Sequence, residues 1–212
     1  MFRQYFKYVV YLLVTLNVFS SHAGSLEDFF VAVRNDNTGS IGRLLERGFD
    51  PNSRDQKGRT GLAVAIQEHS LKAAKLLLAQ PAIEINALNA AGESALMMAA
   101  IKGDTESATL LLDRGAQVNQ PGWSPLHYAA TGPEPRLVQL LLDRGATVDA
   151  LSPNETTPLM MAAQYGSEDS VGLLLAKGAD PARRNQQGQR AFEFAKRSGR
   201  EPLVAQLQKV TP

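Results

Sequence analysis

The chain has 212 residues, with 22 basic and 21 acidic side chains, and hydrophobic residues make up 44% of it. This composition is typical of a folded protein and argues against wholesale disorder. Because the sequence contains no cysteine, disulfide bonds, thiolate nucleophiles, Cys-ligated zinc and iron–sulfur clusters are excluded. The balanced charge gives no general attraction to nucleic acid or anionic lipid.

The first 23 residues have the pattern of a secretory signal peptide. Two basic residues stand in the first seven, an apolar run covers 8–19, and the small residues of Ser21-His22-Ala23 precede Gly24 as in a cleavage site. The run is short for a membrane span, which needs about 20 apolar residues; an uncleaved N-terminal anchor is the alternative. We expect a mature protein in the periplasm, or secreted, without stable membrane insertion.

The rest of the chain repeats with a period near 33 residues. Pairs or triplets of leucine end at positions 45, 78, 112, 142 and 175, which are 33, 34, 30 and 33 residues apart. A second apolar segment, rich in alanine, precedes each of the last four leucine triplets. A fixed period over most of a chain indicates a stacked repeat protein. Each unit then buries its apolar face against its neighbours.

Each repeat is predicted to contain a helix, a turn, a second helix and a polar loop. Ser or Thr at 60, 94, 124 and 157 is expected to cap the first helix, and Pro at 125 and 158 suits its first position. A glycine is expected to stop the second helix in the left-handed conformation, at Gly48, Gly115, Gly145 and Gly178.

Two kinds of motif resemble the ankyrin repeat. The segments SPLHYAA (124–130) and TPLMMAA (157–163) are similar to its T-P-L-H-x-A-A signature, and DQKGRT (55–60) and NAAGES (89–94) are similar to its D-x-x-G-x-T turn. The resemblance covers about 25–209. It implies an all-α ankyrin-repeat solenoid of stacked helix-turn-helix units with short β-hairpin loops.

On this basis residues 24–212 are expected to form a single ankyrin-repeat domain. The expected parts are an N-terminal cap at about 25–54, four repeats at about 55–88, 89–120, 121–151 and 152–184, and a C-terminal cap at about 185–209.

Three departures from the family pattern stand out. His127 is the only copy of the histidine that, in the family, hydrogen-bonds between neighbouring loops, so we expect looser linkage of the other hairpins. The third repeat has lost three residues from its hairpin, where Gln120-Pro121-Gly122-Trp123 replaces a longer turn. The first repeat has gained a residue within 80–83, which should reshape one helix end.

Catalytic motifs are missing from the sequence. There is no G-x-S-x-G, H-E-x-x-H, P-loop or EF-hand pattern. His127 is interpreted as a structural hydrogen-bonding residue, His69 as a capping base at a helix end, and Glu168-Asp169 as acids that stabilise a helix N-terminus. We therefore expect no enzyme activity, no cofactor and no metal site.

Partner contacts are expected on the hairpin tips and the exposed ends of the first helices, because the resemblance implies binding along that concave face. The candidate partner-binding residues are Lys57, Arg59, Gln67, Glu93, Ile101, Lys102, Trp123, Tyr128, Thr131, Glu155, Thr156, Gln164, Tyr165, Gln187, Gln189 and Arg197.

Several candidates have a structural alternative. Trp123, the only Trp, could be an interface hot spot or could fill the space left by the shortened hairpin. Tyr165 could instead pack on the next loop, and the Met97-Met98 and Met160-Met161 pairs are expected to be mostly core. The basic residues of the C-terminal cap could keep its outer face soluble or bind an acidic or phosphate-bearing partner.

The function expected from these features is a non-catalytic protein–protein interaction module outside the cytoplasm, acting as a monomer. An immunity protein against a toxin, a scaffold for an envelope enzyme and a stress-related accessory protein all fit this description. The alternatives are an effector that acts on host proteins and a small-ligand binder or enzyme. A deep pocket ringed by polar groups would favour a ligand.

Overall fold

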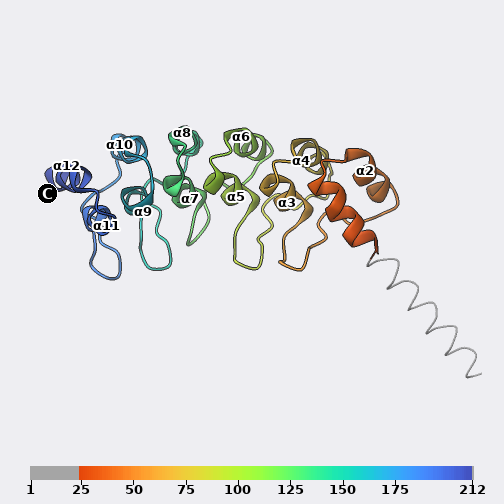
Figure 1. The fold of residues 1–212 in the computed structure, drawn as a ribbon, viewed down its shortest axis with the longest axis horizontal. Coiled ribbons are helices and arrows are strands. Elements are labelled where there is room, and N and C mark those ends of the chain that lie inside the picture. The colour runs from red at the N-terminus through yellow and green to blue at the C-terminus, as the bar shows by residue number, and fades with distance from the viewer. Residues whose placement is uncertain (1–23, 212) are drawn as a thin grey trace, which may run out of the picture. The chain divides into compact units, whose positions relative to one another are not determined.

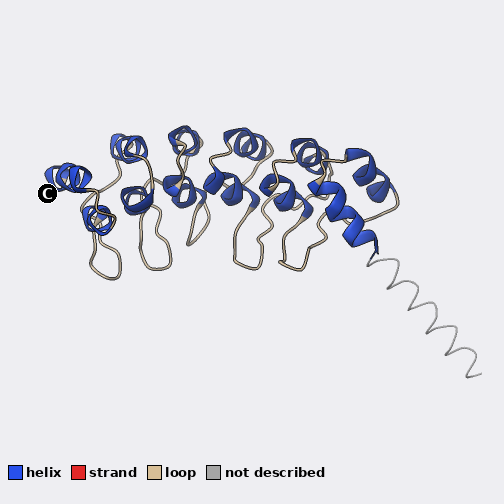
Figure 2. Ribbon diagram, in the orientation of Figure 1, coloured by secondary structure: helices blue, strands red, loops and turns tan. Residues whose placement is uncertain are grey.

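The computed structural model describes residues 24–211, which form two compact units, an N-terminal unit (24–84) and a C-terminal unit (85–211). The regular elements of the described residues are helices joined by turns and loops (Figure 2). None of these helices has the length and hydropathy needed to cross a bilayer. The predicted signal peptide lies outside the described residues, and it stays a prediction.

The N-terminal unit is built around the ring of Phe29. Its helices are a segment over 24–34, α2 (Thr38–Glu46), α3 (Gly61–Gln67) and α4 (Leu71–Leu78). Phe29 is fully buried, and its ring centroid lies 5.3 Å from that of Phe30 and 4.8 Å from that of Phe49. A Cβ on Gly61 would lie 2.6 Å from the Phe29 ring. Glycine at the start of α3 therefore lets the first helix pack closely against it.

The C-terminal unit contains four helix pairs. They are α5 (Ala95–Lys102) with α6 (Thr105–Asp113), α7 (Pro125–Thr131) with α8 (Pro135–Asp143), α9 (Pro158–Tyr165) with α10 (Glu168–Ala176), and α11 (Ala191–Arg197) with α12 (Glu201–Val210). Figure 1 shows α5, α7, α9 and α11 in one row and α6, α8, α10 and α12 in a second row, with the hairpin loops extending beyond the first row.

Leucine and alanine form the core as the repeat pattern predicts. One leucine of each triplet, Leu77, Leu111, Leu141 or Leu174, is fully buried. The alanines near the middle of α5, α7 and α9 are also buried, where consecutive first helices contact each other. Helices of seven to ten residues are marginal alone, so this packing between neighbours holds them in place.

The predicted helix starts are confirmed at three positions. Thr60, Ser94 and Thr157 each accept a hydrogen bond from the backbone N–H three residues later, at 3.3 Å. Ser124 differs, because its hydroxyl oxygen lies 2.9 Å from Nδ1 of His127. This exception falls on the repeat with the shortened hairpin.

The predicted helix stops are confirmed as well. Gly48, Gly115, Gly145 and Gly178 have φ angles between +84° and +89°, a conformation that favours glycine. Helix α4 ends without such a glycine, in the repeat with the extra residue. There the side-chain Nε2 of Gln80 donates to the Leu76 carbonyl at 3.1 Å.

A ladder of Asn and Asp side chains links consecutive loops within each unit. A side-chain oxygen in one loop accepts a backbone N–H from the next, and the pairs are Asn52 with Glu84, Asn86 with Gln117, Asn119 with Thr147, and Asp149 with Asp180. These bonds measure 2.8 to 3.2 Å. They satisfy loop amides at each step, which fixes the spacing between neighbouring loops.

Candidate functional site

Each full-length hairpin is closed by a side-chain oxygen of its first residue. Oδ1 of Asp55, Asn89 and Asn185 accepts two backbone N–H bonds from within its own turn, and Oγ of Ser152 accepts one. A glycine with positive φ completes three of these turns, and Glu155 (φ +61°) takes that place in the fourth. The predicted turns at 55–60 and 89–94 are thereby confirmed.

The shortened hairpin (120–124) is instead held by its neighbours. Gln120 Nε2 donates to the Gly92 carbonyl at 3.3 Å, on the preceding hairpin. His127 Nε2 lies 2.9 Å from the Thr156 carbonyl, on the following hairpin. The structural role predicted for His127 is therefore confirmed.

The hydrogen bonds of His127 define its protonation state. The Ser124 N–H can only donate and lies 3.1 Å from Nδ1, so Nδ1 is unprotonated. The Thr156 carbonyl can only accept, so Nε2 carries the proton. Burial lowers the pKa of His127, although the hydrogen bond to Thr156 opposes this shift. The ring is neutral and serves as a fixed link between two hairpins.

The expectation of looser hairpins elsewhere is wrong for the last one. The backbone N–H of Gln186 donates to the Asn154 carbonyl at 3.1 Å, and its side-chain Nε2 donates to the Pro153 carbonyl at 3.0 Å. A glutamine at a hairpin tip thus supplies the link that His127 supplies one repeat earlier.

Beside the shortened hairpin lies a pocket of about 220 Å³. Its lining residues come from α5, α7, α9 and the hairpin, and they are Ile101, Trp123, His127, Tyr128, Thr131 and Met161. The Trp123 ring meets the His127 ring edge-on, with centroids 5.3 Å apart. Trp123 is still 36% exposed and Ile101 48% exposed. Trp123 therefore packs on its own repeat and remains open to solvent.

Four of the sequence-predicted partner residues meet in this pocket, and sequence reasoning missed two of its lining residues. Met161 was expected to be mostly core, but it stands four residues after its helix cap, in the same register as Tyr128. His127 was recognised only as a structural link. Tyr165 is the most exposed large hydrophobic residue described, at 61%, and does not line the pocket.

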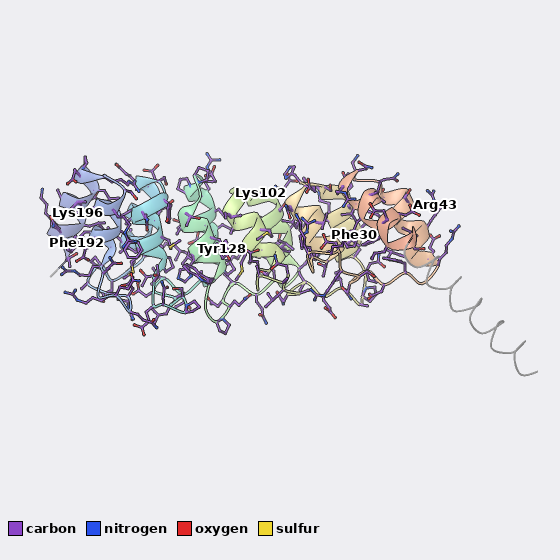
Figure 3. The ribbon with its side chains drawn as sticks, turned by 60° about the horizontal axis from the view of Figure 1, so that its bottom comes forward. Phe30, Arg43, Lys102, Tyr128, Phe192 and Lys196 are labelled. Atoms are coloured by element: carbon purple, nitrogen blue, oxygen red, sulfur yellow. The ribbon has the colours of Figure 1, made fainter. Side chains whose placement is uncertain are left out.

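Tyr128 connects the pocket to a carboxylate. Its hydroxyl donates to Oε1 of Glu93 at 3.2 Å. Burial, together with the negative charge and hydrogen bond of Glu93, raises the pKa of Tyr128 to about 12. Figure 3 shows Tyr128 on α7 and Lys102 on α5. The phenol is therefore neutral at physiological pH and keeps its donated bond.

Other predicted residues pair within their own repeats. In the N-terminal unit, Arg59 donates to Gln67 Oε1 and to Asp55 Oδ2, each at 2.6 Å. In the C-terminal unit, Arg197 donates to Gln189 Oε1 at 2.9 Å. In both cases a tip residue meets the helix-end residue eight positions later. Lys57 is exposed and lines a separate hollow of about 440 Å³ with Arg59, Phe30 and others.

Thr156 requires a correction. This residue is only 2% exposed, and its backbone is held by Ser152 and by His127. It cannot offer a partner the side-chain contact that was expected. Among the remaining candidates, Lys102, Glu155 and Gln187 are exposed and Gln164 is half-buried.

The arginines of the C-terminal cap are used within the fold. Nη1 of Arg200 donates to three carbonyls at the end of α9, those of Ala162, Ala163 and Gly166, at 2.9 to 3.1 Å. The other internal partners are Asp149 for Arg183, the Gly188 carbonyl for Arg184 and Glu193 for Arg190. A cation at a helix C-terminus is stabilising, so these contacts favour the structural interpretation of the cap.

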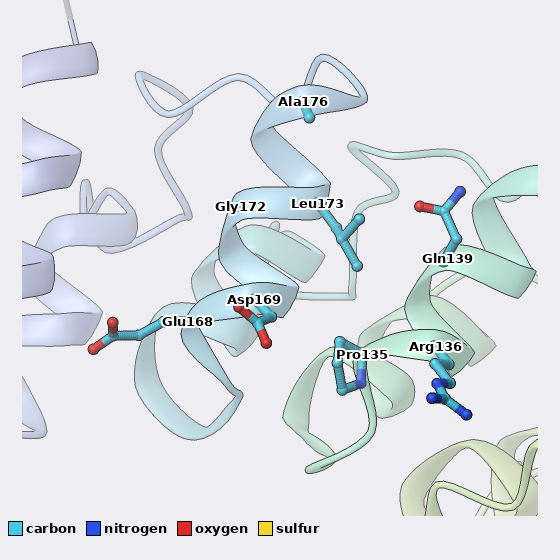
Figure 4. A pocket seen from close by; sticks show the side chains of 8 residues that line it. All are labelled: Pro135, Arg136, Gln139, Glu168, Asp169, Gly172, Leu173 and Ala176. Atoms are coloured by element: carbon cyan, nitrogen blue, oxygen red, sulfur yellow. The ribbon is translucent and has the colours of Figure 1, made fainter.

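Another hollow, of about 500 Å³, lies between α8 and α10 (Figure 4). It is lined by Pro135, Arg136, Gln139, Glu168, Asp169, Gly172, Leu173 and Ala176. The ion pair of Lys177 with Asp143, at 2.9 Å, joins the two helices nearby. This hollow has no aromatic side chain. Within 24–211, no group of three or more His, Asp or Glu side chains is placed to hold a metal ion.

The sequence matches the family model described as ankyrin repeats (3 copies) over residues 29–121 and 118–185. A curated relative is the human transient receptor potential cation channel subfamily A member 1, 27% identical over 159 residues, which are 70% of this chain and 14% of the channel. Another is the I-kappa-B like protein C2 of Microplitis demolitor bracovirus, 33% identical over 79 residues, 37% of this chain and 44% of that protein. The chain thus matches less than half the length of either relative.

A solved structure has the same fold. It is a complex of a predatory endopeptidase from Bdellovibrio bacteriovorus with an immunity protein; the matching chain is 24% identical, with a TM-score of 0.74, and the match covers 86% of this chain and 97% of that one. The likeness and the stacked helix pairs confirm the predicted all-α ankyrin-repeat fold. Because the family model covers most of the sequence, the chain belongs to the ankyrin-repeat proteins.

Proposed function

We propose that this chain is a non-catalytic protein-binding module that acts outside the cytoplasm, with its main contact at the pocket beside the shortened hairpin. The observation that carries the proposal is the exposure of Trp123 and Ile101, which both line one small apolar pocket. Tryptophan in a partly enclosed pocket is enriched among the residues that dominate binding energy. The predicted signal peptide supports a periplasmic or secreted location.

The class of partner is open among a toxin or hydrolase that must be restrained, an envelope enzyme that needs a scaffold, and a stress-related protein. The solved complex from Bdellovibrio bacteriovorus joins an endopeptidase to an immunity protein. At 24% identity this likeness concerns the fold alone and does not identify the partner. A peptidase is one of the partners that the experiment tests. A host protein as partner would favour the effector alternative.

The test is a cross-linked pull-down with the full chain, tagged at its C-terminus and produced in the organism from which it comes, read by mass spectrometry. Two pocket variants, Trp123→Ala and Ile101→Ser, run beside it, with Arg136→Ala in the hollow between α8 and α10 as the matched control. We expect one dominant partner that both pocket variants lose, by more than about tenfold, and that the control keeps.

Melting curves and helical content of all four proteins must agree for this comparison to count. A partner retained by both folded pocket variants would contradict the proposed site. If no partner is enriched, the proposed function itself fails, and a small-ligand screen becomes the next experiment.

A further inference from the structure

The pocket has the size of one side chain. Its volume of about 220 Å³ lies below the range of roughly 300–1,000 Å³ that is usual for small-molecule sites. It is also open to solvent at Trp123 and Ile101. Its dimensions therefore suit a single large residue projecting from another chain better than a whole metabolite.

The polar side-chain atoms of His127, Tyr128 and Thr131 in the lining are already engaged in hydrogen bonds. Both ring nitrogens of His127 are bonded, to Ser124 and Thr156. Thr131 Oγ1 donates to the Tyr128 carbonyl at 2.7 Å, and the Tyr128 hydroxyl donates to Glu93. An occupant therefore meets mainly the carbon and sulfur atoms of Ile101, Trp123 and Met161. Such a lining favours an apolar side chain, because a buried polar group would lack a partner.

Glu93 adds a charge at the rim. Its carboxylate accepts hydrogen bonds from Asn89 Nδ2 at 2.8 Å and from the Tyr128 hydroxyl at 3.2 Å. No lysine or arginine in 24–211 lies within ion-pair distance of it, whereas the half-buried Asp55 and Glu193 both have an arginine. Burial is the main cause of the raised pKa of Tyr128, and the negative charge of Glu93 beside the phenol adds to it.

We propose that the pocket recognises a linear segment of a protein partner in which one large apolar residue stands next to a lysine or arginine. The apolar side chain enters between Ile101, Trp123 and Met161, and the cation pairs with Glu93 above Tyr128. This inference rests on the proposed function and narrows it to the chemistry of the bound segment.

The experiment is a selection from a phage-displayed library of random 12-residue peptides on the full exported chain, immobilised by its C-terminal tag. We expect a consensus with a large aliphatic or aromatic residue beside Lys or Arg. The synthetic consensus peptide is then titrated in solution. Trp123 is the only tryptophan of the chain, so its fluorescence reports directly on occupancy of the pocket.

A thermodynamic cycle isolates the charge pair. Glu93→Gln keeps an acceptor for Tyr128 and should weaken binding about fivefold, the upper range for an exposed ion pair. The peptide with Gln in place of its basic residue should bind equally weakly to both proteins. Glu168→Gln makes the same charge change at the N-terminal end of α10, outside the pocket lining, and should alter affinity less than about twofold.

An acidic consensus, no enrichment, an unchanged Trp123 signal on binding, or equal losses in Glu93→Gln and Glu168→Gln would each overturn the inference. These failures differ from that of the proposed function. A native partner lost from Trp123→Ala and Ile101→Ser would leave the binding module established, even if no linear apolar–basic segment were selected.

Discussion

The hairpins of two neighbouring repeats in the C-terminal unit, before α7 and before α9, are stabilised by different hydrogen bonds. The hairpin before α9 closes itself, since Ser152 bonds to Glu155 and to Thr156 at 2.8 to 3.1 Å. The hairpin before α7 lacks three residues and borrows its contacts from the hairpins on either side, through Gln120 and His127. The pocket lies beside this second hairpin, and Trp123 of the hairpin lines it.

The strongest test of this comparison concerns the glycines that end α7 and α9. A Cβ on Gly166 would lie 2.1 Å from the Ala130 carbonyl oxygen, whereas a Cβ on Gly132 would lie 3.3 Å from its nearest neighbour. Gly166→Ala should therefore cost about 3 kcal/mol or more of unfolding free energy, and Gly132→Ala only about 1. Urea unfolding followed by circular dichroism measures both. Equal costs would mean that the two repeats are packed equally tightly.

The next effect concerns His127, which stands where the neighbouring repeats have Met97 and Met160. Those methionines accept the cap N–H through sulfur, at 3.5 and 3.4 Å. His127→Met can do the same but loses the bond to the Thr156 carbonyl, which also accepts from Ser152. We expect a loss of about 1 kcal/mol at neutral pH.

The same variant should change the response to acid. Burial lowers the pKa of His127 in the folded protein below 6.5, so on acidification the unfolded chain binds a proton at this residue before the folded protein does. The contribution of neutral His127 to the free energy of unfolding is complete above pH 6.5, and it is lost as the pH falls through the folded pKa. The fall in unfolding free energy below pH 6.5 should become shallower in His127→Met and should remain in the control variant His69→Asn. Asparagine tolerates the positive φ of position 69. An identical fall in both variants would refute this assignment.

The smallest effect concerns Glu155. It holds a φ of +61° where the other full-length hairpins have glycine. Glu155→Gly removes this strain and adds chain entropy to the unfolded state, so the net gain should be about 0.5 kcal/mol. Glu155→Gln keeps the strain and should give no gain. A loss of stability in Glu155→Gly would show that the side chain contributes to the hairpin.

The repeat period and local chemistry made most of the fold predictable. Thr60, Ser94 and Thr157 cap helices because each hydroxyl stands directly before an apolar run. Gly115 and Gly178 end helices because glycine readily adopts the left-handed conformation. These features depend on a few consecutive residues, so sequence alone reveals them.

The site was only partly predictable because it depends on which repeats face each other. Ile101, Trp123, Tyr128 and Thr131 were recognised from their place in the repeat. Thr156 is buried at a hairpin whose backbone His127 holds from 29 residues away, and Tyr165 lies outside the pocket lining. No pattern within one repeat contains that information.

The contact of Arg200 with the end of α9 has a consequence for how the stack unfolds. The terminal pair of a repeat array is the part most ready to detach, since it has a neighbour on one side only. In this protein the Arg200 guanidinium of the terminal pair also donates hydrogen bonds to three carbonyls of the preceding pair. Fraying of α11 and α12 would leave those carbonyls without their cap, so the last two helix pairs should open as one cooperative block.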